Sequence, residues 1–234
     1  MLIIGLAGQA GVGKGTAADY LVAAHGFVKL SFAAALYQEV AKAYDLGEDE
    51  FLLRDRATKE KPISRLSLEE CSDHAFVEVA HTMLDRIGGI TLPHDLKPLS
   101  PRQVLQWWGT QYRRAQNENY WILQVEAAIG QLWSACAYPE HRPQLFVCDD
   151  VRFENERKFI SCGGGGIWHI RRDGVAPVNT HESENPLPVL EGERELFNHD
   201  SIVRLHGGVD LLLRTNATFV RVEPMLVDGG RSHG

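Results

Sequence analysis

The chain has 234 residues, of which 44% are hydrophobic and 24% are charged, a composition that excludes a disordered, collagen-like or coiled-coil protein. Acidic residues (31) outnumber basic ones (24), and the net charge of −7 argues against a general nucleic-acid-binding protein. No run reaches the ~18 apolar residues of a membrane helix. The four cysteines lack the paired spacing of a zinc site or a disulfide framework: Cys71, Cys136, Cys148 and Cys162. We therefore expect a cytoplasmic protein with no membrane or nucleic-acid partner.

The first 32 residues predict one strand–helix–strand unit of a parallel sheet. Residues 2–7 form the apolar run of a strand that is buried on both faces, and a glycine-rich loop follows over 8–15. A helix is predicted over 16–24, ending at Gly26, and a second strand over 27–32. This order of strand, helix and strand predicts parallel pairing with a right-handed crossover.

A long helical block separates this unit from the rest of the predicted sheet. Helices are predicted over 33–45, 68–88 and 120–133, with another through Leu105 and Trp108, and residues 47–65 are rich in charge. A crossover needs only about a dozen residues. We therefore expect the excess to form a region that covers the substrate.

The C-terminal third supplies the remaining strands. Strands are predicted over 145–148, 166–171 and 195–198, and helices over 154–161 and 201–214. The first of these strands ends at Asp149 and Asp150. The whole chain is predicted to be one α/β domain, with a core over about 1–45 and 140–215, a helical insertion over about 46–135, and a frayed tail over about 226–234.

The glycine-rich loop matches a phosphate-binding loop (P-loop), and its sequence is Gly-Gln-Ala-Gly-Val-Gly-Lys-Gly-Thr over 8–16. Glycines let backbone N–H groups turn toward phosphate oxygens, and the helix that follows directs its positive end at the same anion. A lysine in this position reaches the β- and γ-phosphates, and the hydroxyl of Thr16 serves Mg²⁺ directly or through water. The predicted ATP-binding residues here are Gly8, Gly11, Gly13, Lys14, Gly15 and Thr16. The fold class that follows is a three-layer P-loop NTPase fold with a parallel sheet of about five strands, and the Gly-Lys-Gly-Thr ending resembles adenylate kinase and its relatives.

Three further sequence blocks follow the P-loop in a characteristic order. They are Ser-Pro-Arg-Gln-Val-Leu-Gln-Trp-Trp-Gly-Thr from residue 100, Asp-Val-Arg-Phe-Glu-Asn-Glu from residue 150, and His-Glu-Ser-Glu from residue 181. Together with the P-loop they resemble the deoxynucleoside monophosphate kinases of tailed phages, from residue 2 to about residue 205. The resemblance implies transfer of the ATP γ-phosphate, with Mg²⁺, to a deoxynucleoside monophosphate (dNMP) in the host cytoplasm, and it implies a homodimer.

Both the resemblance and the residue chemistry suggest an acceptor site. Asp150 ends a strand at the sheet edge where ligands bind, and it is suited to hold Mg²⁺ through water or to accept a sugar hydroxyl. The fork of N–H donors on an arginine suits a monophosphate dianion. We expect the substrate to bind Arg102, Gly109, Thr110, Trp121, Asp150, Arg152 and Glu156, with Trp121 as the base contact. The predicted catalytic residues, which neutralise charge, are Lys14, Arg102 and Arg152, and Arg172 is expected to cover the ATP phosphates or adenine.

Several alternatives remain open from the sequence. Glu156 is as well placed for a salt bridge with Arg152 as for binding substrate. Arg56 and Lys59 suit either phosphate contacts or a solvated surface. The rival functions are another small-molecule kinase, such as a dephospho-coenzyme A or phosphomevalonate kinase, and a P-loop regulatory ATPase or binding module.

Overall fold

The structure is a computed structural model that describes residues 1–47, 53–55, 57–88, 93–175, 187–199 and 201–215. Its five strands are β1 (Leu2–Ala7), β2 (Val28–Leu30), β3 (Leu145–Val151), β4 (Gly166–Arg171) and β5 (Arg194–Phe197). Its α-helices are α1 (Lys14–His25), α2 (Ala34–Ala43), α3 (His74–Ile87), α4 (Pro101–Gln106), α5 (Tyr120–Ser134), α6 (Glu154–Cys162) and α7 (Ile202–Thr215). A π-helix, η5 (Trp107–Arg114), continues α4, and short 3-10 turns lie at 64–66, 68–70, 94–96 and 139–141.

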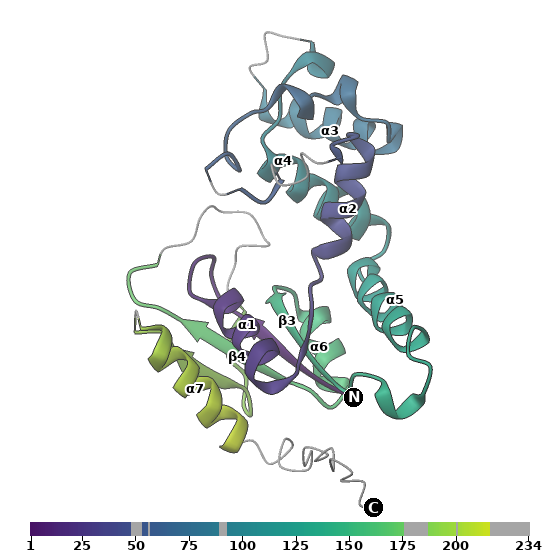
Figure 1. The fold of residues 1–234 in the computed structure, drawn as a ribbon. Helices are drawn as coiled ribbons and strands as arrows, with labels where there is room; N and C mark the ends of the chain where they lie inside the picture. The colour runs from purple at the N-terminus through teal and green to yellow at the C-terminus, as the bar shows by residue number, and fades with distance from the viewer. Residues whose placement is uncertain (48–52, 56, 89–92, 176–186, 200, 216–234) are drawn as a thin grey trace, which may run out of the picture.

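The five strands form one parallel sheet in the order β2-β3-β1-β4-β5. In the register of the central pair, Leu2 lies opposite Leu145 and Ala7 opposite Val151, while Ile4 lies opposite Gly166 on β4. Because all five strands run the same way, their carboxyl ends share one edge. The P-loop leaves β1 at the middle of that edge (Figure 1).

Helices cover both faces of the sheet, giving three layers (Figure 1). Helices α1 and α7 pack together on one face, over a core that includes Leu6, Leu21 and Trp168. Helix α6 packs on the other face, where Ile160 contributes to a second core. This second core also includes buried residues of the helical block, such as Phe76 and Trp108.

The helical block lies between β2 and β3 in the chain and beyond the carboxyl edge of the sheet in space (Figure 1). Its centre is the fully buried Trp108, whose ring lies 4.6 Å from that of Phe76 on α3. Glu39 on α2 joins three elements of the block, because it accepts hydrogen bonds from Trp108 Nε1 (2.8 Å), Arg113 Nε (2.7 Å) and the Tyr120 hydroxyl (2.5 Å). The block is therefore held by polar contacts as well as by its core.

The predicted fold class is confirmed, but several element boundaries were wrong. The second strand is shorter than 27–32, since residues 31–33 turn away to bond Asp150. The strand predicted over 145–148 continues to Val151, because β1 pairs with it as far as Ala7. The helix predicted over 68–88 starts only at 74, where the Asp73 carboxylate caps it by accepting from the Phe76 N–H (3.0 Å).

Smaller differences between the predicted and observed helices concern where they begin and which type of helix they form. Helix α1 begins at Lys14, two residues before the predicted start, so the lysine lies in its first turn. The helix through Leu105 and Trp108 changes to a π-helix at Trp107, which aromatic spacing does not indicate. Within the described residues, no helix combines the length and apolar character needed to cross a membrane.

Candidate active site

The P-loop has the backbone conformation that its glycines predict. Gly8, Gly11 and Gly13 have φ angles of 137°, 85° and 106°, which side chains disfavour. A Cβ atom on Gly8 would also lie 2.4 Å from the Ile170 carbonyl oxygen on β4. The loop thus passes close to the sheet and leads directly into α1. The backbone N–H groups in the first turn of α1 are directed at the loop.

The Lys14 side chain folds back over this loop. Its Nζ donates to the carbonyl oxygens of Gly8 (2.7 Å) and Gln9 (2.8 Å). Thr16, two residues further along α1, is exposed. A cationic amine and the N-terminus of a helix therefore lie together at this loop, with a hydroxyl residue in the same helical turn, a combination suited to a polyphosphate with its metal ion.

The side chain of the residue just after β5, Asn198, bonds the P-loop. Asn198 Nδ2 donates to the Val12 carbonyl oxygen (2.9 Å), and the Asn198 N–H donates to the Arg171 carbonyl oxygen (2.7 Å). A Cβ atom on Gly13 would lie 2.6 Å from Asn198 Nδ2, so a side chain there would displace this amide in addition to straining the backbone. Sequence reasoning missed Asn198, because nothing in the sequence shows that the end of β5 reaches the loop after β1.

The two acidic residues of β3 have different surroundings. Asp150 accepts hydrogen bonds from the Ser31 hydroxyl (2.7 Å), the Phe32 N–H (3.0 Å) and the Ala33 N–H (2.8 Å). Asp149 forms an ion pair with Lys29 (2.9 Å), and its Oδ2 lies 3.8 Å from where a Cβ atom of Gly15 would be. Burial and the adjacent Asp149 raise the pKa of Asp150, although the three hydrogen bonds oppose this. Asp150 thus holds the start of the helical block, while Asp149 lies beside the P-loop.

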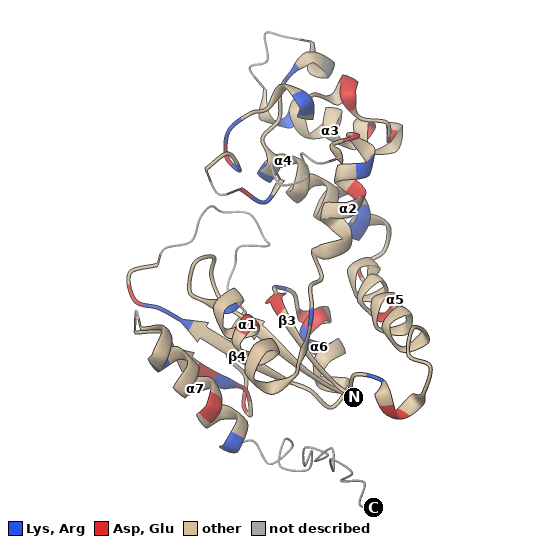
Figure 2. Cartoon of the chain, in the orientation of Figure 1, with Lys and Arg blue, Asp and Glu red and all other residues tan. Residues whose placement is uncertain are grey.

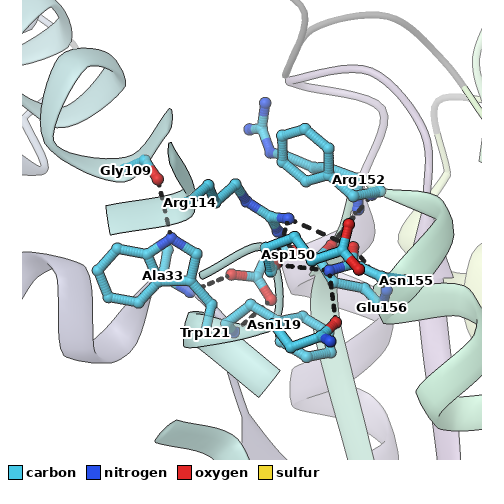
Figure 3. Close-up of polar contacts among 12 residues, drawn as sticks. Ala33, Gly109, Arg114, Asn119, Trp121, Asp150, Arg152, Asn155 and Glu156 are labelled. Carbon is cyan, nitrogen blue, oxygen red and sulfur yellow. Dashed lines mark hydrogen bonds and ion pairs between the residues drawn. The ribbon is translucent and has the colours of Figure 1, made fainter. Parts of the chain in front are cut away.

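One pocket between the sheet edge and the helical block brings together all seven predicted acceptor residues. It is lined by Arg102, Gly109, Thr110, Trp121, Asp150, Arg152 and Glu156, and also by Lys59. Most of these residues come from α4, η5, α5, β3 and α6, which are distant in the chain. Figure 3 shows Gly109, Trp121, Asp150, Arg152 and Glu156 brought close together. Of the two other predicted contacts, Lys59 lines this pocket and Arg56 lies outside the described residues.

Arg102 and Trp121 each have a partner within the protein. Arg102 forms an ion pair with Glu60. Trp121 is buried, and its Nε1 donates to the Gly109 carbonyl oxygen (3.1 Å), a bond drawn in Figure 3. The indole therefore supports the π-helix as well as lining the pocket.

Glu156 makes a buried ion pair, but with Arg114. Its other oxygen accepts from the backbone N–H groups of Arg152 (2.8 Å) and Phe153 (3.1 Å), at the start of α6 (Figure 3). Burial raises the pKa of Glu156 to about 7, against the opposing effects of Arg114 and these N–H groups. The sequence left open a salt bridge between Glu156 and Arg152. In the structure Glu156 forms an ion pair with Arg114 and accepts a hydrogen bond from the backbone N–H of Arg152.

The pocket also contains residues that the sequence prediction did not include, among them Tyr37, Arg114 and Phe153. Arg114 follows Thr110 by four residues, so helical spacing was an available signal, but in an α-helix the neighbouring Arg113 has an equal claim. Tyr37 on α2 gives no such signal, since an aromatic residue on an amphipathic helix is more often part of a core.

The predicted ATP residue Arg172 lies at a second pocket, next to the P-loop. This pocket is lined by Gly8, Gln9 and Val12 of the loop and by residues 169–173 at the end of β4. Figure 2 shows basic positions at this end of β4 and also in the loop that follows α2. The sequence block at His181 and Glu184 lies outside the described residues.

Fold and site together define a class. A five-stranded parallel sheet in the order 2-3-1-4-5, with a glycine-rich loop between β1 and a helix that begins at a lysine, is the fold of a P-loop kinase. No family model matches the sequence. The chain is 32% identical over 213 residues to a protein of Acanthamoeba polyphaga mimivirus named "Putative deoxynucleotide monophosphate kinase", and the match covers 89% of this chain and 94% of that protein. The chain belongs to the deoxynucleotide monophosphate kinase family.

Proposed function

We propose that this protein transfers the γ-phosphate of ATP to a deoxynucleoside 5′-monophosphate, giving ADP and a deoxynucleoside diphosphate. The observation that carries the proposal is the pocket at the carboxyl edge of the sheet, where seven residues singled out from separate sequence blocks line one cavity. The P-loop opens at the same edge, so a donor and an acceptor have adjacent places to bind.

On the donor side, the P-loop binds the ATP phosphates. Lys14 now bonds two carbonyl oxygens of the loop, and in the complex its amine exchanges them for β- and γ-phosphate oxygens. This exchange keeps the charge of Lys14 beside the phosphoryl group during transfer. Arg172, at the neighbouring pocket, contributes a second positive charge to ATP.

The oxygen ligands that Mg²⁺ prefers are present at this site. Thr16 is exposed in the first turn of α1, and Asp149 and Asp150 lie near the carboxyl end of the adjacent strand β3. Thr16 and Asp149, which lies beside Gly15, would hold the ion, and Asp150, whose two oxygens already accept hydrogen bonds, would reach it only through water. When bound, Mg²⁺ would neutralise phosphate charge.

On the acceptor side, arginines hold the monophosphate and bring it into line with ATP. Arg102 lines the pocket from α4 and Arg152 from the segment just after β3, so two separate parts of the chain each contribute a positive charge. Positioning and charge neutralisation account for most of the catalysis of phosphoryl transfer, and no general base is required. Trp121, Gly109 and Thr110 form the wall for the nucleoside.

The proposal is tested by ADP release over a panel of the four dNMPs, the matching ribonucleotides, dephospho-coenzyme A and phosphomevalonate. We expect turnover with at least one dNMP and none with the last two. Lys14→Ala should lower kcat by about 10²–10³ or more, as loss of a preorganised contact to the reacting group does. Lys42→Ala, an exposed lysine on α2, is the matched control and should retain wild-type kcat. Turnover that is confined to dephospho-coenzyme A or phosphomevalonate, or ATP hydrolysis that no acceptor accelerates, would refute the proposal.

A further inference from the structure

The side chain of Arg114 is held in the acceptor pocket by contacts from several elements. Its guanidinium forms the ion pair with Glu156, donates to the Glu118 carbonyl oxygen (3.2 Å) and to Asn155 Oδ1 (3.3 Å), and lies 3.7 Å from the centre of the Phe153 ring. Only 10% of the side chain is exposed. Figure 3 shows Arg114 beside Asn155 and Glu156. These contacts come from other parts of the chain and restrict the orientation of the guanidinium.

Stability alone does not explain this arrangement. A buried ion pair gains little over an apolar pair of similar size, since both charges lose their hydration. Glu156 is 3% exposed, so the protein carries this desolvation cost at the wall of a cavity. Such a cost is expected where the charge itself is used.

The preceding arginine provides the contrast. Arg113 is also paired, with Glu39, but its guanidinium packs against the rings of Tyr112 (4.4 Å) and Tyr120 (5.2 Å) inside the helical block. It is absent from the residues that line the acceptor pocket. Two adjacent arginines of one π-helix thus have separate surroundings, one within the block and one at the cavity.

The π-helix is what brings Arg114 to the cavity. Its wider turn is marked by the bond from the Ala115 N–H to the Thr110 carbonyl oxygen, five residues earlier. This turn lines the pocket with Gly109, Thr110 and Arg114. Trp121 stabilises it by bonding the Gly109 carbonyl. Such turns are often found at functional sites, and here the turn adds a cation to the wall.

The charge of the pocket indicates what this cation binds. The basic side chains in its wall are Lys59, Arg102, Arg114 and Arg152, and the acidic ones are Asp150 and Glu156. In a protein of net charge −7, this local excess of positive charge fits a phosphate dianion. A planar fork of donors also matches two phosphate oxygens better than it matches a neutral base.

We propose that Arg114 binds the 5′-phosphate of the acceptor nucleotide, and that Glu156 is a positioning residue that holds this guanidinium in place. The inference rests on the proposed function and adds to it a third arginine. Glu156 bonds the backbone of residues 152–153 as well, so it also couples Arg114 to the segment that carries Arg152.

The test compares Arg114→Gln with Arg113→Gln, which removes the same charge one residue away. Steady-state kinetics with the preferred dNMP should show KM for dNMP at least tenfold higher in Arg114→Gln, with KM for ATP within about twofold. Arg113→Gln should leave both KM values within about twofold. Arg114→Lys should recover only part of the loss, because the fork is absent. Urea unfolding of each variant shows whether the fold is retained.

Calorimetric binding identifies the group that is recognised. We expect Arg114→Gln to weaken binding of the dNMP at least tenfold and to leave binding of the matching deoxynucleoside, which lacks the phosphate, within about twofold. Equal weakening of both ligands would overturn the phosphate assignment. If the wild type turns over a dNMP and Arg114→Gln behaves like Arg113→Gln, the inference fails alone. If the wild type neither binds nor turns over any dNMP, the proposed function fails and the inference with it.

The role of Glu156 is tested by combining variants. Glu156→Gln should lower the preference for dNMP over deoxynucleoside in the wild-type background and have little further effect in the Arg114→Gln background. A purely structural role would lower the free energy of unfolding but leave this preference unchanged, which would refute the positioning role.

Discussion

Replacing Asp150 by asparagine separates its structural role from a metal-binding one. The carboxylate accepts three hydrogen bonds from residues 31–33, two of them on Oδ2 and one on Oδ1. An asparagine side chain has a single acceptor oxygen, so at best it keeps the two bonds at the Oδ2 position. The Phe32 N–H then loses its acceptor, and an unsatisfied backbone donor costs about 1–3 kcal/mol. Asp150→Ala leaves both N–H groups without the carboxylate and should cost about 2–5 kcal/mol.

The assay is urea unfolding at pH 7, followed by tryptophan fluorescence, with Asp149→Asn as the matched control. Asp149→Asn removes an ion pair with Lys29, which is 37% exposed, and should change the free energy of unfolding by no more than about 1 kcal/mol. The denaturant dependence should be the same in all variants, so that shifts in midpoint report stability. If Asp150→Asn unfolds within about 0.5 kcal/mol of the wild type, the carboxylate does not hold this segment and the reasoning is refuted.

The same variants address Mg²⁺. Because both oxygens of Asp150 already accept hydrogen bonds, we expect Asp149→Asn to raise the Mg²⁺ concentration for half-maximal turnover more than Asp150→Asn does. The reverse order would assign the metal to Asp150 and leave Asp149 as a partner of Lys29.

Three further predictions follow from other contacts. Asn198→Ala removes the bond to the Val12 carbonyl and should raise KM for ATP several-fold while KM for dNMP stays constant, and an equal rise in both would contradict a role confined to the P-loop. Gly8→Ala places a Cβ atom 2.4 Å from a carbonyl oxygen of β4 and should lower the free energy of unfolding by at least about 2 kcal/mol, whereas Gly130→Ala, in open space within α5, should raise it by about 0.5–1 kcal/mol. The folded state raises the pKa of Glu156 from its ordinary 4.5 to about 7 and so binds the proton more tightly than the unfolded state. The wild type should therefore lose about 3 kcal/mol of stability relative to Glu156→Gln as pH rises from about 4.5 to 7, and urea midpoints that run parallel over this range would exclude the shift.

The parts of the fold that depend on local sequence were predictable. A continuous apolar run followed by glycines and a lysine specifies β1, the P-loop and α1 within a few residues. The strand over 166–171 was predicted with its observed ends, since glycines precede it and charged residues follow. The pocket residues were found because sequence blocks marked them, not because any pattern showed that α4 and β3 meet.

The remaining features depend on contacts that no local pattern contains. Strand β3 includes two aspartates because its neighbours impose the register, although acidic residues predict a strand end. The π-helix contains the buried Trp108 and the Gly109 carbonyl that Trp121 bonds, contacts that only the folded chain shows, whereas the spacing of its aromatic residues favours an α-helix. Only the geometry of the π-helix shows that Arg114, and not the neighbouring Arg113, lines the pocket.

The bridge between Ile63 and Leu99 makes the segment between them suitable for replacement during evolution or in design. These residues pair in antiparallel fashion, with the Ile63 N–H donating to the Leu99 carbonyl oxygen (3.0 Å), so the chain between them leaves and returns at one point. Segments whose ends meet tolerate changes of length, because doubling a loop costs only about 0.6 kcal/mol in closure entropy. This excursion is therefore a natural unit for exchange, by recombination or by design, that would leave the sheet and the P-loop intact. A replacement must still supply an apolar cover for Trp108, which Phe76 provides here.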